Sequence, residues 1–190
     1  RAAWGTSILG ITAYGGISVL SKSRRGAAGK GIVVFGVAML AVGALLQYLL
    51  QYEEIATMLS HRSKMQRYDN DRFFTQFEAL RTAIDNPLGL GPGVSEGVFT
   101  RAIHSLYIRA LVENGVLGLL SVALVLGTTL VVSTFTAIQR RSFDPNADAT
   151  IIAAALWAVA IQSVVIDSIH WRHFWMLLAL GWWLPVSSND

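Results

Sequence analysis

Five stretches of the chain contain no charged residue, and their lengths predict membrane-spanning helices. One stretch runs from Ala2 to Ser21, and charged residues bound the other four: Lys30 and Glu53, Glu113 and Arg140, Asp148 and Asp167, Arg172 and Asp190. A helix needs about 20 mostly apolar residues to cross the hydrocarbon core of a bilayer. We therefore predict an all-α, polytopic integral membrane protein, a helical bundle with about five transmembrane helices.

The predicted spans enclose one long polar loop between the second and the third. The spans are expected at residues 2–20, 31–52, 106–138, 150–166 and 174–186. The chain then divides into residues 1–52 with two spans, residues 53–105 as the polar loop, and residues 106–190 with three spans. Arg109, Glu113 and Asn114 interrupt the start of the third span, so we expect a helical lead-in there. Gly115 and Gly118 would mark the point where the chain enters the bilayer.

Within the polar loop, the apolar positions predict one amphipathic helix. Residues 53–64 are expected to be helical or irregular, and residues 66–71 are polar and turn-like. Between residues 71 and 84, apolar side chains recur every three or four positions, as on one face of a helix: Phe73, Phe74, Phe77, Leu80, Ile84. Residues 86–93 form a Gly/Pro turn cluster, which ends that helix.

Composition and charge agree with a membrane protein and assign a side to each loop. The chain is 53% hydrophobic and 14% charged, far below the roughly 25% charged residues of a soluble domain. The loop at residues 21–30 holds four basic residues and no acid, and Arg140 and Arg141 follow the third span. Cytoplasmic loops are enriched in Lys and Arg, so these loops are expected inside and the polar loop outside. The basic residues therefore indicate the topology of the chain, and we predict no nucleic-acid partner.

Two further features limit the interpretation of the chain. It contains no cysteine, so neither a disulfide framework nor a thiolate site is expected. It begins at Arg1 and enters an apolar stretch at once. We expect it to be a fragment of a longer membrane protein that lacks its N-terminal part.

His104 and the loop arginines are the candidates for chemistry. The unperturbed pKa of histidine lies closest to neutral, so His104 could accept a proton from an alcohol; the alternative is an interfacial histidine that only hydrogen-bonds. A guanidinium matches phosphate oxygens, but seven acids share the loop with its arginines, so a solvated loop is the alternative there. Arg72 is favoured because it opens the amphipathic helix.

Other motifs are weaker, and no metal or cofactor is predicted. Glycines 89, 91 and 93 are not followed by the Gly-Lys-Ser/Thr of a phosphate-binding loop. His170 and His173 lie near Asp167, but their spacing does not fit a usual zinc site, and structural pairing is favoured. No Gly-x-Ser-x-Gly motif is present.

One motif resembles the signature of a known family. His104-Ser105, nine residues and Gly115-x-x-Gly118 match the signature His-[Asn/Ser/Gln]-x9-Gly-x-x-[Gly/Thr/Tyr] of the O-antigen ligase superfamily. That group includes O-antigen polymerases and protein O-oligosaccharyltransferases. Residues 72–93 resemble the family's large periplasmic loop, and Arg1-Ala2-Ala3-Trp4 resembles the tail of its Ser-Arg-small motif.

The resemblance implies a metal-independent, inverting glycosyltransferase with a GT-C-like fold in the bacterial inner membrane. Such an enzyme moves a glycan from undecaprenyl diphosphate to an acceptor hydroxyl at the periplasmic face. By this resemblance His104 would be the base, while Arg72 and Arg1 would hold the diphosphate. Supporting roles are expected for a further set of residues: Arg101, Ser105, Gly115, Gly118, Asp167, Arg172.

Several functions stay open at this point. A polymerase would use the same donor with a lipid-linked glycan as acceptor, and a protein transferase would glycosylate a protein; the acceptor could be a glycan, a lipid or a protein. A transporter is less favoured, because transporters usually place ionisable residues within their spans. A purely structural membrane subunit is a further alternative.

Overall fold

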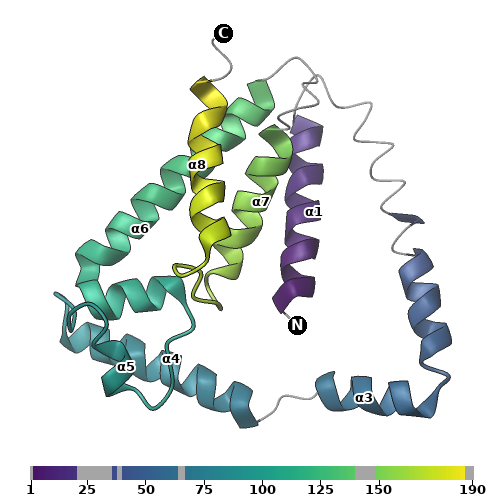
Figure 1. The fold of residues 1–190 in the computed structure, drawn as a ribbon, viewed down its shortest axis with the longest axis horizontal. Helices are drawn as coiled ribbons and strands as arrows, with labels where there is room; N and C mark the ends of the chain where they lie inside the picture. Colours follow the sequence, from purple (N-terminus) through teal and green to yellow (C-terminus); the bar gives the residue numbers. More distant parts are fainter. Residues whose placement is uncertain (1, 21–35, 38–39, 64–66, 140–148, 187–190) are drawn as a thin grey trace.

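The described part of the chain is helical throughout its regular secondary structure. The computed structural model describes residues 2–20, 36–37, 40–63, 67–139 and 149–186 (Figure 1). Besides an apolar helix at Leu40–Leu49, the helices are α1 Ala2–Leu20, α3 Glu53–Ser63, α4 Arg67–Asp85, α5 Ser95–Val98, α6 Leu106–Gln139, α7 Ala149–Gln162 and α8 Arg172–Val186. The predicted all-α class is confirmed for these residues.

Four helices, α1, α6, α7 and α8, form a bundle in which α7 packs against each of the other three (Figure 1). The α1–α7 contact uses small side chains: Ala149 and Ala153 are buried together with Ile17. A Cβ on Gly10 would lie only 3.6 Å from the Cβ of Ala158. Small residues let helices approach closely where no hydrophobic force drives them together, as in membranes.

Hydrogen bonds between side chains and neighbouring helices add to this packing. Trp182 Nε1 donates to Thr129 Oγ1 at 2.9 Å, which joins α8 to α6. Trp157 Nε1 donates to Thr134 Oγ1 at 3.1 Å, and the Tyr107 hydroxyl donates to the Ala160 carbonyl at 2.8 Å. Both of these join α6 to α7, so the three helices are fixed to one another by polar as well as apolar contacts.

The number of spans stays a prediction. Among the described residues, α6 alone is long and apolar enough to cross a membrane by length and composition, and the apolar helices Thr6–Leu20, Leu40–Leu49 and Ala149–Gln162 are shorter. The two basic loops that predicted the cytoplasmic side, residues 21–30 and Arg140 with Arg141, lie outside the described residues. The described ends at Leu20 and Gln139 lie at the end of the bundle opposite the α7–α8 turn (Figure 1).

Helix α4 begins earlier than the sequence predicts. The turn-like assignment of residues 66–71 is wrong for residues 67–71, which are the first turn of α4. Ala79 and Ala83 bury one face of α4 against Val112 of α6, and this packing fixes the helix. Extending a fixed helix gains one hydrogen bond per residue, which outweighs the weak helix propensity of Asn and Asp. Arg72 therefore lies in the second turn and does not open the helix.

Helix α6 breaks at Gly115, where the Gly/Pro turn of residues 87–93 docks against it. Gly115 has φ 67° and ψ −162°, a non-helical conformation inside the helix. Leu90 N–H donates to the Val112 carbonyl at 2.8 Å, and Gly91 N–H donates to the Glu113 carbonyl at 2.9 Å. On the other side of the break, Val116 N–H donates to the Pro87 carbonyl at 3.0 Å. The turn thus satisfies backbone groups that the break would leave without helical partners.

The glycines at this junction are required by close backbone approaches. A Cβ on Gly89 would lie 2.5 Å from the Glu113 carbonyl oxygen, and one on Gly115 would lie 2.5 Å from the Leu88 carbonyl carbon. The bend also brings the Ala110 carbonyl oxygen within 2.8 Å of where a Cβ on Gly118 would stand. Both glycines of the His-Ser-x9-Gly-x-x-Gly motif therefore shape the bend.

We expect Gly115→Ala to lower the free energy of unfolding by at least about 1–3 kcal/mol, because alanine is strained at this φ and ψ and its Cβ meets the turn. Gly127→Ala is the matched control: its Cβ would meet nothing within 4 Å, and a helical Gly→Ala exchange is neutral or slightly stabilising. Thermal unfolding in detergent, followed by circular dichroism at helical wavelengths, measures both. Equal midpoints for the two variants would contradict the strain at Gly115.

Candidate functional site

Three segments that are distant in sequence meet at one end of the bundle. They are the second turn of α4, the residues that lead into α6, and the turn between α7 and α8 (Figure 1). Leu106 N–H donates to the Ser163 carbonyl at 3.0 Å, and the Arg72 guanidinium donates to the Val165 carbonyl. Ile103 and Leu106 are buried beside these bonds. The junction is therefore held by hydrogen bonds to backbone carbonyls and by apolar packing.

Arg72 brings an unneutralised positive charge to this junction. Within the described residues it has no carboxylate within ion-pair distance, and its Nε is buried without a hydrogen-bond acceptor. By contrast, Arg101 Nη2 lies 3.1 Å from Asp71 Oδ2. A guanidinium carries a planar fork of N–H donors and a full positive charge, and no carboxylate of the described residues neutralises the charge of Arg72.

His104 lies beside Arg72 and is half-buried. Burial lowers the pKa of His104 below its ordinary value, the positive charge of Arg72 lowers it further, and the carboxylate of Asp167 acts in the opposite direction. The lowered pKa favours the neutral imidazole, the form that can accept a proton. The structure brings together three residues that the sequence analysis assigned to the site from separate regions of the chain.

Next to this pair, Arg109 is the centre of a partly buried charge cluster. Its Nη1 lies 2.9 Å from Asp167 Oδ2, its Nε 3.2 Å from Glu113 Oε1 and its Nη2 3.1 Å from Glu96 Oε1. The side chains of Arg109, Glu113 and Asp167 are only 15%, 8% and 10% exposed. His170 Nε2 lies 3.0 Å from Arg109 Nη1 at the exposed edge. The cluster therefore fixes Asp167, whose charge acts on His104.

Sequence reasoning missed this cluster. It treated Arg109 and Glu113 as interruptions of an apolar span, although their spacing of four residues on a helix is a signal for an ion pair. The buried Ser95 hydroxyl, which donates to the Glu113 carboxylate, carried no signal in the sequence. Its position on α5 depends on how the loop docks against α6.

Ser105, the second motif residue, has a local structural role. It immediately precedes α6, is 1% exposed, and its hydroxyl accepts from Ile108 N–H at 3.4 Å. A serine before the first helical residue commonly satisfies an N–H of the first turn in this way. Of the motif residues, Ser105 therefore caps the helix, Gly115 and Gly118 form the bend, and His104 is the candidate for chemistry.

The remaining predicted site residues are placed less centrally. Arg101 pairs with Asp71 at the exposed edge of the site. Asp71 is the residue before Arg72 in the sequence. Arg172 is exposed at the first residue of α8 and has no ion-pair partner in the described part of the chain. Arg1 lies outside the described residues. The structure therefore does not place Arg172 in the site.

The two histidines of the α7–α8 turn have separate contacts. The ring of His173 stacks against Trp171 with centroids 4.9 Å apart, whereas His170 contacts Arg109 and lies 3.7 Å from Asp167. Over the residues that the structure describes, no group of three or more His, Cys, Asp or Glu side chains could hold a metal ion.

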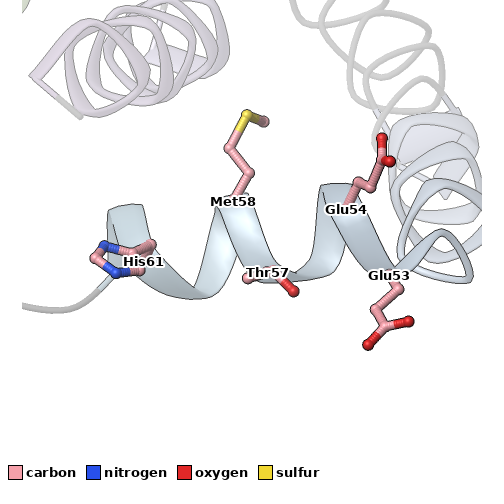
Figure 2. A pocket seen from close by; sticks show the side chains of 5 residues that line it. All are labelled: Glu53, Glu54, Thr57, Met58 and His61. Carbon is pink, nitrogen blue, oxygen red and sulfur yellow. The ribbon is translucent and has the colours of Figure 1, made fainter.

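Hollows elsewhere in the described residues include one between α1 and α7, lined by Gly10 and Ala154 among others. An apolar cavity of about 160 Å³ lies between α6 and α8 and begins at Leu106 and Ile169, next to the site. A shallow depression runs along α3, which stands apart from the bundle (Figure 1). Figure 2 shows the residues that line it, all exposed and all from this one helix: Glu53, Glu54, Thr57, Met58, His61. Of these hollows, only the one between α6 and α8 adjoins the catalytic candidates.

Comparison of the chain with protein-family models, with curated proteins and with solved structures finds no match.

Proposed function

We propose that this chain is part of an O-antigen ligase-like glycosyltransferase of the bacterial inner membrane. It would transfer a glycan from an undecaprenyl-diphosphate carrier to an acceptor hydroxyl at the periplasmic face, without a metal ion and with inversion at the sugar. The proposed architecture is a bundle of about five transmembrane helices with residues 53–105 as a periplasmic loop. The resemblance of the His104 motif supplies the substrate class.

The observation that carries this proposal is the junction that brings Arg72 to the α7–α8 turn, where its positive charge acts on the half-buried His104. An arginine without a carboxylate partner in the described residues suits the anionic diphosphate of the donor. A half-buried histidine, whose lowered pKa favours the neutral form, suits the acceptor hydroxyl, which must lose a proton. Together they place a cation and a base within one small region, as a diphosphate leaving group and an alcohol nucleophile require.

In the proposed reaction, the acceptor oxygen attacks the anomeric carbon of the sugar and the hydroxyl proton passes to His104. A new glycosidic C–O bond forms as the bond between the anomeric carbon and the phosphate oxygen breaks. Undecaprenyl diphosphate leaves with the bonding electron pair. Arg72 stabilises the negative charge that develops on the diphosphate, in the way that fixed donors stabilise developing charge in other enzymes.

The apolar surfaces of the bundle support a membrane setting. Helix α6 has membrane-crossing length, yet only 17% of its most apolar window is buried, whereas the core helix of a soluble protein would be mostly buried. The apolar cavity between α6 and α8 begins beside the site. Its lining and its place suit the first isoprene units of a lipid carrier whose diphosphate lies at Arg72.

We expect Arg72→Gln in the full-length protein to lower the rate of glycan transfer by about 10²–10³-fold, the usual cost of removing one donor to a developing negative charge. The matched control is Arg81→Gln, since Arg81 lies on the same helix with its guanidinium 4.5 Å from the centroid of Phe77. Initial rates with a purified undecaprenyl-diphosphate-linked glycan measure both variants. Equal rates for Arg72→Gln and Arg81→Gln would contradict a diphosphate role for Arg72.

A further inference from the structure

Helix α4 carries three distinct faces. The face against α6 is buried and includes Thr75, Ala79 and Ala83. A second face holds the exposed polar residues Glu78 and Asp85. Between them runs an apolar stripe with spacings of four, three and four residues, which places its members on one side of a helix: Phe73 49% exposed, Phe77 53%, Leu80 39% and Ile84 78%.

The chain leads from the stripe to the exposed apolar surface of α6. The backbone of Leu88, which follows α4, closely approaches Gly115 at the break in α6, while the residue is 84% exposed. The exposed apolar face of α6 begins at that point with Val116 and Leu117 and continues along the helix. Leu88 follows the last stripe residue, Ile84, by four positions, and its backbone lies where the exposed apolar face of α6 begins.

The direction of α4 fits a membrane surface. It runs crosswise to α7 and α8 at one end of the bundle, and the first turns of α6 before the break also run crosswise (Figure 1). Helices that lie at a bilayer interface bury one apolar face among the headgroups and upper acyl chains. The guanidinium of Arg81 lies over the Phe77 ring, an arrangement in which the charge can reach the headgroup layer while the stem covers apolar surface.

We propose that α4 is an interfacial helix whose stripe of Phe73, Phe77, Leu80 and Ile84 is inserted into the outer leaflet of the membrane. Arg72 lies on the same helix, and a helix that lies along the interface keeps it near the lipid phosphates. A lipid-linked diphosphate then meets Arg72 without leaving the headgroup layer. This inference rests on the membrane placement that the proposed function requires.

Single cysteines test the depth of each face, because the chain has no cysteine of its own. Cysteine replaces Phe77 or Ile84 on the stripe, Glu78 or Asp85 on the polar face, and Leu120 on α6 as a standard for lipid exposure. Each variant of the full-length protein carries an environment-sensitive fluorophore in vesicles of phosphatidylethanolamine and phosphatidylglycerol. Quenching by doxyl-labelled lipid and by aqueous iodide is then compared.

The expected result is strong lipid quenching and weak iodide quenching at positions 77 and 84, and the reverse at positions 78 and 85. Lipid quenching at Leu120 alone, with positions 77 and 84 quenched by iodide or by neither agent, would overturn the interfacial helix and leave the proposed function standing. Absence of lipid quenching at Leu120 as well would overturn the membrane placement itself. If another part of the protein covered the stripe, neither agent would quench the fluorophore at positions 77 and 84.

Discussion

Replacing His104 by alanine is expected to lower the rate of glycan transfer by about 10²–10⁴-fold, the usual contribution of a general base. The reason is that His104 accepts the proton of the acceptor hydroxyl in the proposed reaction, and its lowered pKa favours the neutral form that this role needs. Complementation with the full-length protein, scored by surface glycan on gels, gives the first measurement. Initial rates with purified protein give the magnitude.

The pH dependence of the rate tests the same assignment. Burial and Arg72 lower the pKa of His104, so the active neutral form persists as pH falls and the rate declines only below the ordinary value of about 6.5. Without the Arg72 charge the pKa rises, and the residual rate of Arg72→Gln should decline at a higher pH than that of the wild type. Arg81→Gln should keep the wild-type profile.

Two outcomes would contradict the role of His104. The first is full glycan attachment in both His104→Ala and Arg72→Ala cells that contain normal amounts of protein. The second is an acid limb that does not move when the Arg72 charge is removed, because the base would then be a group distant from Arg72.

Replacing Arg109 by methionine is expected to lower the free energy of unfolding by about 3–5 kcal/mol, the usual cost of removing one partner from a buried ion pair. Methionine keeps an unbranched apolar stem but leaves the carboxylates of Glu113 and Asp167 buried without their cation. Chemical or thermal unfolding of the purified protein in detergent measures the loss.

Two further variants separate the buried charges from a general loss of arginine. Arg101→Met breaks an ion pair whose side chains are 43% and 42% exposed, and should cost no more than about 1 kcal/mol. Adding Glu113→Gln to Arg109→Met removes one unpaired charge and should restore part of the loss. If Arg109→Met and Arg101→Met were equally stable, the cluster would not contribute to the fold in this way.

Much of the helical framework could be predicted from residue order alone. The charge-free stretches placed α1, α6, α7 and α8 within a few residues of their observed bounds, because an apolar run of that length has few other stable conformations. The start of α4 was placed too late, since the packing of Ala79 and Ala83 against α6 extends the helix into a polar segment. Local propensity contains no information on that contact.

The candidate site was likewise predictable from the sequence only in part. The spacing from His104 to Gly118 is local, so the motif could be recognised, with Gly115 and Gly118 expected where the chain enters the bilayer. The break at Gly115 could not, because it depends on the docking of the turn of residues 87–93. The contact between α4 and the α7–α8 turn could not, because Arg72 reaches the Val165 carbonyl across a long separation in sequence. For the same reason Arg109 looked like an interruption of a span, although it binds Asp167.

The sequence by itself determined the helical class, the polar loop and the residue types capable of chemistry, because hydrophobic periodicity and charge act over a few residues. The tertiary structure alone decided which of those residues meet. Helix α4 packs on α6, and the α7–α8 turn packs against both. This packing determines which charges surround each group. It leaves Arg72 without a carboxylate in the described residues, pairs Arg109 with Asp167 and Glu113, and lowers the pKa of His104 through burial and the charge of Arg72.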